Sequence, residues 1–456
     1  MLAYGVCHLD LESSGEAETL CLTVFFLTDG VFWTDIMAIG YKMAANEISP
    51  ADAQSARPGN KTTEPSLHGL PTLVRWYINT REWEANGLDL PLLNILRPAE
   101  QEAVRRYHHA SDRRMSLASH LLKYLYIHRA CGIPWTDIIF SRTPMPENRP
   151  FYASNSNTQV DFNVSHQASL TALAGVIAPS QEQLASQSVQ GIAPSLPRTG
   201  IDITCVNERR KPMNTMKDFT EFVTIFSEVF SPKELATMQN PLPTLRRARE
   251  LGLASSFPSD DDATIIEYGL RLFYSYWALK EAYLKMTGDA LLAEWVRHLE
   301  FTNVIPPAPV DPLIASKPYG LSTGAEYIPQ SPHNWGPPYA DVEVSRDGEV
   351  IEDVRLQLQA FESDYIVATA GRGCPVGPIP EECENDGEHH LPNRHGALLV
   401  RGTTTGKRIP ISAHMAVGDS DPWCPGSTIV DPWLPMQEVD IELDIRACAE
   451  GRCSHP

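Results

Sequence analysis

Three short segments hold residue types suited to binding a cation and a phosphate group. Residues 161–167 read DFNVSHQ, residues 200–204 read GIDIT, and residues 277–285 read WALKEAYLK. Carboxylate oxygens such as those of Asp202 and Glu281 are ligands for hard divalent cations. Hydroxyl, imidazole and ammonium groups can donate hydrogen bonds to phosphate oxygens. We treat the three segments as candidate parts of one site.

Glu281 lies in an apolar context that calls for an explanation. Residues 267–287 repeat apolar side chains at helical spacing, and Glu281 falls on the same face of the expected helix. Burial of an uncompensated carboxylate costs several kcal/mol. Glu281 is therefore expected to be protonated, or to pair with Lys280, Lys285 or a metal ion. The apolar residues of this face are Leu270, Phe273, Tyr274, Trp277 and Leu284.

The order of these three segments resembles the 4′-phosphopantetheinyl transferase superfamily, in particular its larger monomeric class. The resemblance covers about residues 71–371, and residues 431–433 and 440–453 are similar to the tail of fungal members. It implies transfer of 4′-phosphopantetheine from coenzyme A to a serine of an acyl or peptidyl carrier domain, with release of 3′,5′-ADP. The carrier domains of such enzymes serve polyketide, nonribosomal peptide, fatty-acid and lysine pathways.

The resemblance implies a magnesium site. Asp202 and Glu281 would be ligands, and Glu281 would also accept the serine proton, directly or through water. Bacterial relatives carry an acidic residue where this chain has Thr204, and Gln167 stands where animal relatives fill that vacancy. Each residue also has a plain alternative: a turn hydrogen bond for Asp202, an ion pair with Lys285 for Glu281, and polar surface for Gln167.

The resemblance also implies contacts with coenzyme A. Ser165 and His166 would bind its phosphates, and Lys285 would hold the pyrophosphate, which makes Lys285 a catalytic residue together with Asp202 and Glu281. Lys280 is a further candidate, or a solvent-facing side chain. The residues expected near the adenine and the 3′-phosphate are Arg142, Arg149, Ser116 and Arg114.

Two other function classes are less compatible with the sequence. A non-catalytic relative could bind coenzyme A or carrier domains as a scaffold, but it would not need Asp202, Glu281 and Lys285 together. A magnesium-dependent nucleotide hydrolase or kinase would be expected to carry a glycine-rich phosphate loop or a kinase signature set, and the sequence has neither.

Composition narrows the partners and the compartment. The net charge of −20 argues against a main role in binding nucleic acid. Nine scattered cysteines form no disulfide framework, so we expect a cytoplasmic protein. The apolar residues 20–27 lack the basic flank of a signal peptide and are too short for a membrane span, so no membrane association is expected.

The pattern of apolar residues predicts the α+β class, with helices against a small, mainly antiparallel sheet in each half. The resemblance implies that the two halves are lobes related by a pseudo-twofold axis. Ser231 and Glu234 form an expected capping box, and Gly288 is expected to end the long helix. Residues 240–263 are expected to be a loop. Predicted helices are 98–107, 115–129 and 267–287, and predicted strands are 74–78, 138–140, 161–164, 170–177, 201–206, 354–358 and 366–370.

We expect five regions along the chain. Residues 1–70 form a leader of unknown role, 71–178 and 200–372 form the two lobes, 179–199 link them, and 373–456 are a mostly disordered tail with a short ordered end. The tail residues Cys383, His389, His390 and His395 match no zinc spacing, and neither does the pair Cys448 and Cys453.

Overall fold

The computed structural model describes residues 73–143, 149–152, 160–177, 197–208, 213–289, 293, 295–310, 334–373, 376 and 433–453. All of them belong to one compact unit of the chain, Leu67–Pro456. The expected leader and the residues Cys383, His389, His390 and His395 lie outside the described residues.

The first sheet has four strands in the order β12 (Trp433–Glu438), β1 (Leu73–Asn79), β5 (Leu170–Ile177) and β4 (Val160–Gln167). β5 runs antiparallel to both of its neighbours, whereas β12 runs parallel to β1. A strand from the end of the chain therefore completes the sheet that the first described strand begins.

Helix α3 (Ala110–Cys131) packs against the first sheet. Its side chains are buried on the side that faces β5 and β4, and a Cβ added at Gly175 of β5 would lie 2.5 Å from the Tyr126 ring. The helix ends at Gly132, which adopts the left-handed conformation that favours glycine. The smaller elements of this half are α1 (Arg81–Ala85), η1 (Leu93–Ile95), α2 (Pro98–Arg105), η2 (Trp135–Asp137), β2 (Phe140–Arg142) and β3 (Pro150–Tyr152).

The second sheet is antiparallel in the order β10 (Val354–Phe361), β11 (Tyr365–Arg372) and β6 (Arg198–Cys205). Helix α8 (Asp262–Thr287) covers it and packs against β6 and β11. The other elements of this half are α5 (Met216–Thr224), α6 (Pro232–Gln239), α7 (Leu242–Glu250), η3 (Val296–His298), β7 (Leu299–Thr302), β8 (Glu343–Arg346) and β9 (Glu349–Val350).

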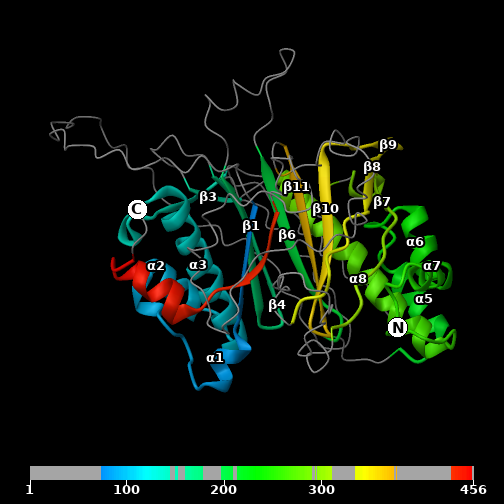
Figure 1. Ribbon diagram of the computed structural model, residues 1–456, viewed down its shortest axis with the longest axis horizontal. Coiled ribbons are helices and arrows are strands. Elements are labelled where there is room, and N and C mark those ends of the chain that lie inside the picture. The colour runs from blue at the N-terminus through cyan, green and yellow to red at the C-terminus, as the bar shows by residue number, and fades with distance from the viewer. Residues whose placement is uncertain are drawn as a thin grey trace, which may run out of the picture. The chain divides into compact units, whose positions relative to one another are not determined.

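The two sheets face each other, with helices on their outer sides. Figure 1 shows α2 and α3 on one side of the strands and α5, α6 and α7 on the other. A hydrophobic cluster joins the inner faces, and burial of its apolar surface stabilises their association. Members of this cluster include Tyr77, Leu170, Ile201, Phe361, Tyr365 and Trp433.

Strands β4 and β6 meet edge to edge through side chains. Asp161, Asn163, Ser165 and Gln167 each accept a hydrogen bond from the backbone N–H of the residue 38 positions later, at 2.8, 3.2, 3.3 and 3.0 Å. Because alternate residues of a strand point the same way, one polar stripe of β4 serves the whole contact. This stripe fixes the register of β6 against β4.

The α+β prediction is confirmed, and each sheet with its helices forms one half of the described structure. The pseudo-twofold relation between the halves stays a prediction. The capping box is confirmed, since Ser231 and Glu234 exchange hydrogen bonds with each other's backbone N–H. The loop predicted over residues 240–263 is wrong, because it contains helix α7. In the described part of the chain, no helix combines the length and the apolar character needed to cross a membrane.

Candidate active site

Three of the predicted site residues meet at the junction of β4, β6 and α8. The Lys285 ammonium lies 2.6 Å from Asp202 Oδ1 and donates to Ser165 Oγ at 3.0 Å. Ser165 Oγ in turn donates to the same Asp202 oxygen at 3.0 Å. Asp202 is 5% exposed, whereas the Lys285 side chain is 29% exposed. A buried carboxylate therefore lies beside a cation that solvent and ligands can reach.

Gly200 sets the distance between β6 and α8. A Cβ at this position would lie 2.0 Å from Ala282 O and 2.6 Å from Met286 N, which are both backbone atoms of α8. Only glycine allows so close an approach. Asp202 lies two residues further along the strand and shares the face of Gly200, so it also points toward the helix. The glycine thus brings Asp202 within reach of Lys285.

Glu281 does not lie on a buried stripe, so the expectation from its apolar neighbours is wrong. Most of α8 is buried, but Leu270, Trp277, Glu281 and Lys285 are only half-buried and follow one another at spacings of seven, four and four residues. This is one side of a helix. Glu281 and Lys285 therefore share the single accessible stripe of α8.

The remaining predicted metal-site residues have structural partners. Gln167 uses its carbonyl oxygen to accept from Cys205 N at 3.0 Å and its amide to donate to Glu208. Thr204 is buried, and its hydroxyl lies 3.3 Å from both Tyr274 O and Ile366 O. The hydroxyl at position 204 therefore binds backbone carbonyls of the second half.

Arg149 has a different place from the one expected. It is 5% exposed, and its guanidinium donates to Asp161 Oδ2 at 2.8 Å, with which it forms an ion pair. It also donates to four backbone carbonyls, those of Lys285, Met286, Phe162 and Thr199, at 2.8, 3.1, 3.2 and 2.7 Å. Arg149 therefore ties β4, β6 and the end of α8 together instead of facing the adenine or a 3′-phosphate.

Lys280 also lies away from the site. Its ammonium and the Glu234 carboxylate are 2.9 Å apart and both fully buried, and the ammonium also donates to Val296 O and Leu299 O. Burial lowers the pKa of Lys280, and the charge of Glu234 opposes this shift. In this position Lys280 can neither contact coenzyme A nor face solvent. Lys280 instead joins α8 to α6 and β7.

The other predicted phosphate contacts are spread over α3, β4 and β2. Arg114 is buried and its guanidinium donates to Glu84 Oε2 at 2.6 Å, while Ser116 lies half a turn later on the same helix. His166 is half-buried on β4, on the opposite face from Ser165. These three residues therefore lie on α3 and on the face of β4 opposite Ser165.

Arg142 is exposed at the end of β2 and belongs to a cationic group that the sequence reasoning missed. Burial and the nearby charge of Arg142 lower the pKa of Lys123 to about 8. Burial, then Lys123 and Arg142, lower the pKa of His120. Both residues lie on α3, one helical turn apart. The separation of three residues was a usable signal, because such pairs share a helix face.

The donor set at the junction fits a magnesium ion. Asp202 would supply a carboxylate from a strand, and Glu281 would supply one from the accessible stripe of the facing helix. Magnesium binds one or two carboxylates and keeps water and substrate oxygens as its other ligands. Lys285 already balances the charge of Asp202 in the absence of metal.

The chain is similar to known proteins over most of its length. A family described as "4′-phosphopantetheinyl transferase, N-terminal" matches residues 76–178, and the "4′-phosphopantetheinyl transferase superfamily" matches residues 198–313. The "4′-phosphopantetheinyl transferase A" of Aspergillus fumigatus is 42% identical over 407 residues, covering 84% of this chain and 96% of the relative. The "4′-phosphopantetheinyl transferase NpgA" of Emericella nidulans is 39% identical over 399 residues, with the same coverage.

A more distant relative extends the comparison to animals. The "L-aminoadipate-semialdehyde dehydrogenase-phosphopantetheinyl transferase" of Mus musculus is 27% identical over 241 residues, covering 52% of this chain and 61% of the relative. The two fungal relatives span nearly their whole length in the match and are well above 30% identity. On this ground the chain belongs to the 4′-phosphopantetheinyl transferase superfamily.

Proposed function

We propose that this protein transfers the 4′-phosphopantetheine arm of coenzyme A to a serine of acyl or peptidyl carrier domains, in a magnesium-dependent reaction. Membership of the family supports the transfer, the use of coenzyme A and the action on carrier domains. The observation that carries the magnesium-dependent mechanism is the meeting of Ser165, Asp202 and Lys285 between the two sheets.

Lys285 is suited to hold the pyrophosphate. Its ammonium is partly exposed and oriented by two contacts, with Asp202 Oδ1 and Ser165 Oγ. A fixed cation stabilises negative charge that develops on the oxygen of a departing phosphate. When bound, magnesium would supply further positive charge to the same oxygens, held by Asp202 and Glu281.

Glu281 is the proposed base. It lies one helical turn before Lys285 on the accessible stripe of α8, where a carrier-domain serine could approach. Its carboxylate would take the proton of the serine hydroxyl, directly or through water. The serine oxygen then forms a bond to the β-phosphorus of coenzyme A, the bond from that phosphorus to the bridging oxygen breaks, and 3′,5′-ADP leaves.

The test is the intact mass of an apo carrier domain incubated with this protein, coenzyme A and magnesium. We expect a gain of one phosphopantetheine group, and we expect Asp202→Asn and Glu281→Gln each to lower the initial rate at least a hundredfold, which corresponds to about 2.7 kcal/mol. Glu267→Gln is the matched control, because Glu267 is an exposed carboxylate on the same helix.

Two results would overturn the proposal. An unmodified carrier domain, together with saturable binding of coenzyme A, would favour the non-catalytic alternative. Full rates for folded Asp202→Asn and Glu281→Gln would remove both carboxylates from the mechanism. Addition of a chelator should stop the wild-type reaction, and excess magnesium should restore it; a rate that the chelator leaves unchanged would exclude the magnesium requirement.

A further inference from the structure

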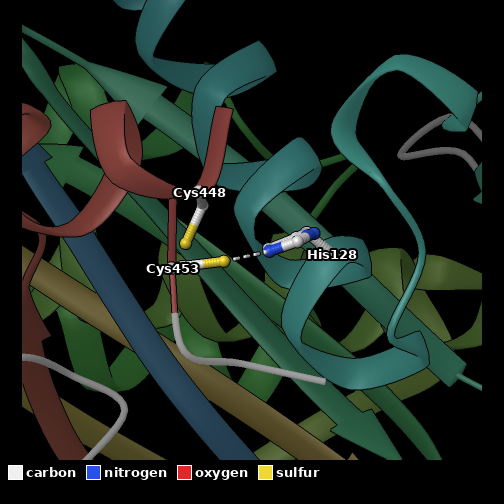
Figure 2. Close-up of side chains that lie close together, drawn as sticks. All are labelled: His128, Cys448 and Cys453. Atoms are coloured by element: carbon white, nitrogen blue, oxygen red, sulfur yellow. Dashed lines mark hydrogen bonds between the residues drawn. The ribbon is translucent and has the colours of Figure 1, made fainter. Parts of the chain in front are cut away.

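We propose that His128, Cys448 and Cys453 form a metal site that holds a zinc ion and fastens the C-terminal segment to helix α3. His128 is far from the two cysteines in the sequence, and all three side chains lie together in the structure (Figure 2). Their ligand atoms all lie within 4.8 Å of one another. This site is separate from the proposed active site and does not depend on the proposed function.

The geometry is close to that of a zinc site. His128 Nε2 lies 3.2 Å from Cys453 Sγ. Zinc binds cysteine sulfur at about 2.3 Å and histidine nitrogen at about 2.0–2.1 Å, so its tetrahedral ligands lie about 3.5–3.8 Å apart. Side-chain movements of at most about one ångström would give this arrangement. Two sulfurs and one imidazole are also donors that bind zinc in preference to magnesium.

The histidine is already held in the right tautomer. Its Nδ1 lies 2.7 Å from the backbone oxygen of Ile133, which can only accept, so Nδ1 carries the hydrogen. Nε2 is then the ring nitrogen left to bind a metal, and it lies beside Cys453 Sγ. Zinc-binding histidines usually donate their second ring N–H to an oxygen in this way, which fixes the direction of the ring.

The cluster lies where the chain end returns to the first half. The π-helix η5 (Ile441–Arg446) is followed by α11 (Ala447–Ala449), which carries Cys448. Arg129 of α3 lies 3.5 Å from Asp444 Oδ1, and both side chains are almost fully buried. Ile441, Ile445 and Cys448 belong to the same hydrophobic cluster as α3. The backbone near both cysteines is thus already positioned by contacts that need no metal.

Among the described residues, the cluster has three protein ligands and a partly exposed outer side. His128 and Cys448 are 6% and 2% exposed, whereas Cys453 is half-buried. The outer side of the cluster therefore faces water, which can supply the fourth ligand. Because β12 precedes this segment and pairs with β1, a metal here would also stabilise the edge of the first sheet. On loss of the metal, the C-terminal segment would detach from α3 before the rest of the protein unfolds.

The test is cobalt binding by the full chain, purified in a phosphine reductant and stripped of metal. Cobalt bound by cysteine sulfur gives a charge-transfer band in the near ultraviolet and strong visible bands typical of tetrahedral sites, whereas a carboxylate site gives neither. We expect one cobalt per chain with these bands, their loss on addition of zinc, and a melting temperature that rises with zinc concentration.

Variants separate this site from others. Cys453→Ser, at a half-buried position, and His128→Asn should each abolish the sulfur-to-cobalt band. Cys131→Ser is the matched control, because Cys131 is a half-buried cysteine of α3 outside the cluster, and it should keep the band. Absence of the band in the reduced wild-type protein would overturn the proposal, as would its loss in Cys131→Ser. A Cys448–Cys453 disulfide in the purified protein, with no cobalt bound after reduction, would overturn it as well.

Discussion

Replacement of Arg149 by methionine should destabilise the fold before it affects the binding of coenzyme A. The guanidinium donates to Asp161 and to four backbone carbonyls, and the side chain is 4% exposed. Two of these carbonyls, those of Lys285 and Met286, belong to the last turn of α8, where no helical N–H can reach them. Methionine fills a similar volume but leaves all five acceptors without this donor.

The expected loss is about 3–5 kcal/mol, the usual cost of removing one partner of a buried ion pair. At about 2 °C per kcal/mol for a unit of this size, the melting temperature should fall by about 6–10 °C. Arg198→Ala is the control, because Arg198 lies 4.0 Å from the same Asp161 but is 46% exposed. An exposed pair contributes about 0–1 kcal/mol, so that variant should melt close to wild type.

The pH dependence of the loss gives a second check. Burial raises the pKa of Asp161, and Arg149 opposes this rise. Without Arg149 the folded protein favours protonated Asp161 more strongly, so protons stabilise the variant relative to wild type. The difference in melting temperature should therefore shrink as the pH falls from about 7 to about 5. Equal losses for Arg149→Met and Arg198→Ala would refute this reasoning, and so would an unchanged melting temperature with a raised KM for coenzyme A.

Two further predictions follow from the packing and charge of the described residues. Gly200→Ala should lower the free energy of unfolding by more than the about 1–3 kcal/mol of ordinary overpacking, because the new methyl group would lie 2.0 Å from Ala282 O. Gly336→Ala is the control and should melt near wild type, because the nearest neighbour of its new methyl group is a side-chain methyl at 3.2 Å. Equal losses of stability in the two variants would contradict this prediction. Lys123→Met should melt above wild type at pH 7, because burial and Arg142 lower the pKa of Lys123 to about 8. Unfolded lysine keeps its proton to higher pH, so wild type should gain on the variant as the pH rises above about 8; a difference that does not change with pH would contradict this.

Local patterns predicted most of the elements, since their signals lie within a few residues. Gly288 ends α8 with a left-handed residue, as its position predicted, and Ser231 and Glu234 cap α6 as expected. Helix α7 escaped prediction because its sequence LPTLRRARE is highly polar, and only Leu245 and Ala248 are buried. The place of β12 could not be predicted either. Nothing local tells a strand near the end of a chain that its partner is β1.

The site was predictable in its composition but less so in its geometry. Order along the chain brought Ser165, Asp202 and Lys285 into one hypothesis, and they do meet. Helical periodicity misplaced Glu281, because a helix buried on nearly every side has no distinct apolar face to read. The role of Arg149 could not be predicted for another reason. A basic residue in a loop looks the same in sequence whether it binds a ligand or five acceptors inside the protein.

The charges on α3 and β2 make a better candidate for the anionic end of coenzyme A than Arg149 does. A cation whose charge is already balanced inside the fold gains little from a phosphate, and Arg149 lies against the Asp161 carboxylate. Lys123 and His120 are in a different situation, because burial lowers the pKa of both and the like charge of Arg142 lowers it further. An anion bound among these three residues would reverse that repulsion and raise both pKa values. Groups whose pKa is shifted by burial and by neighbours of like charge are candidates for a functional site.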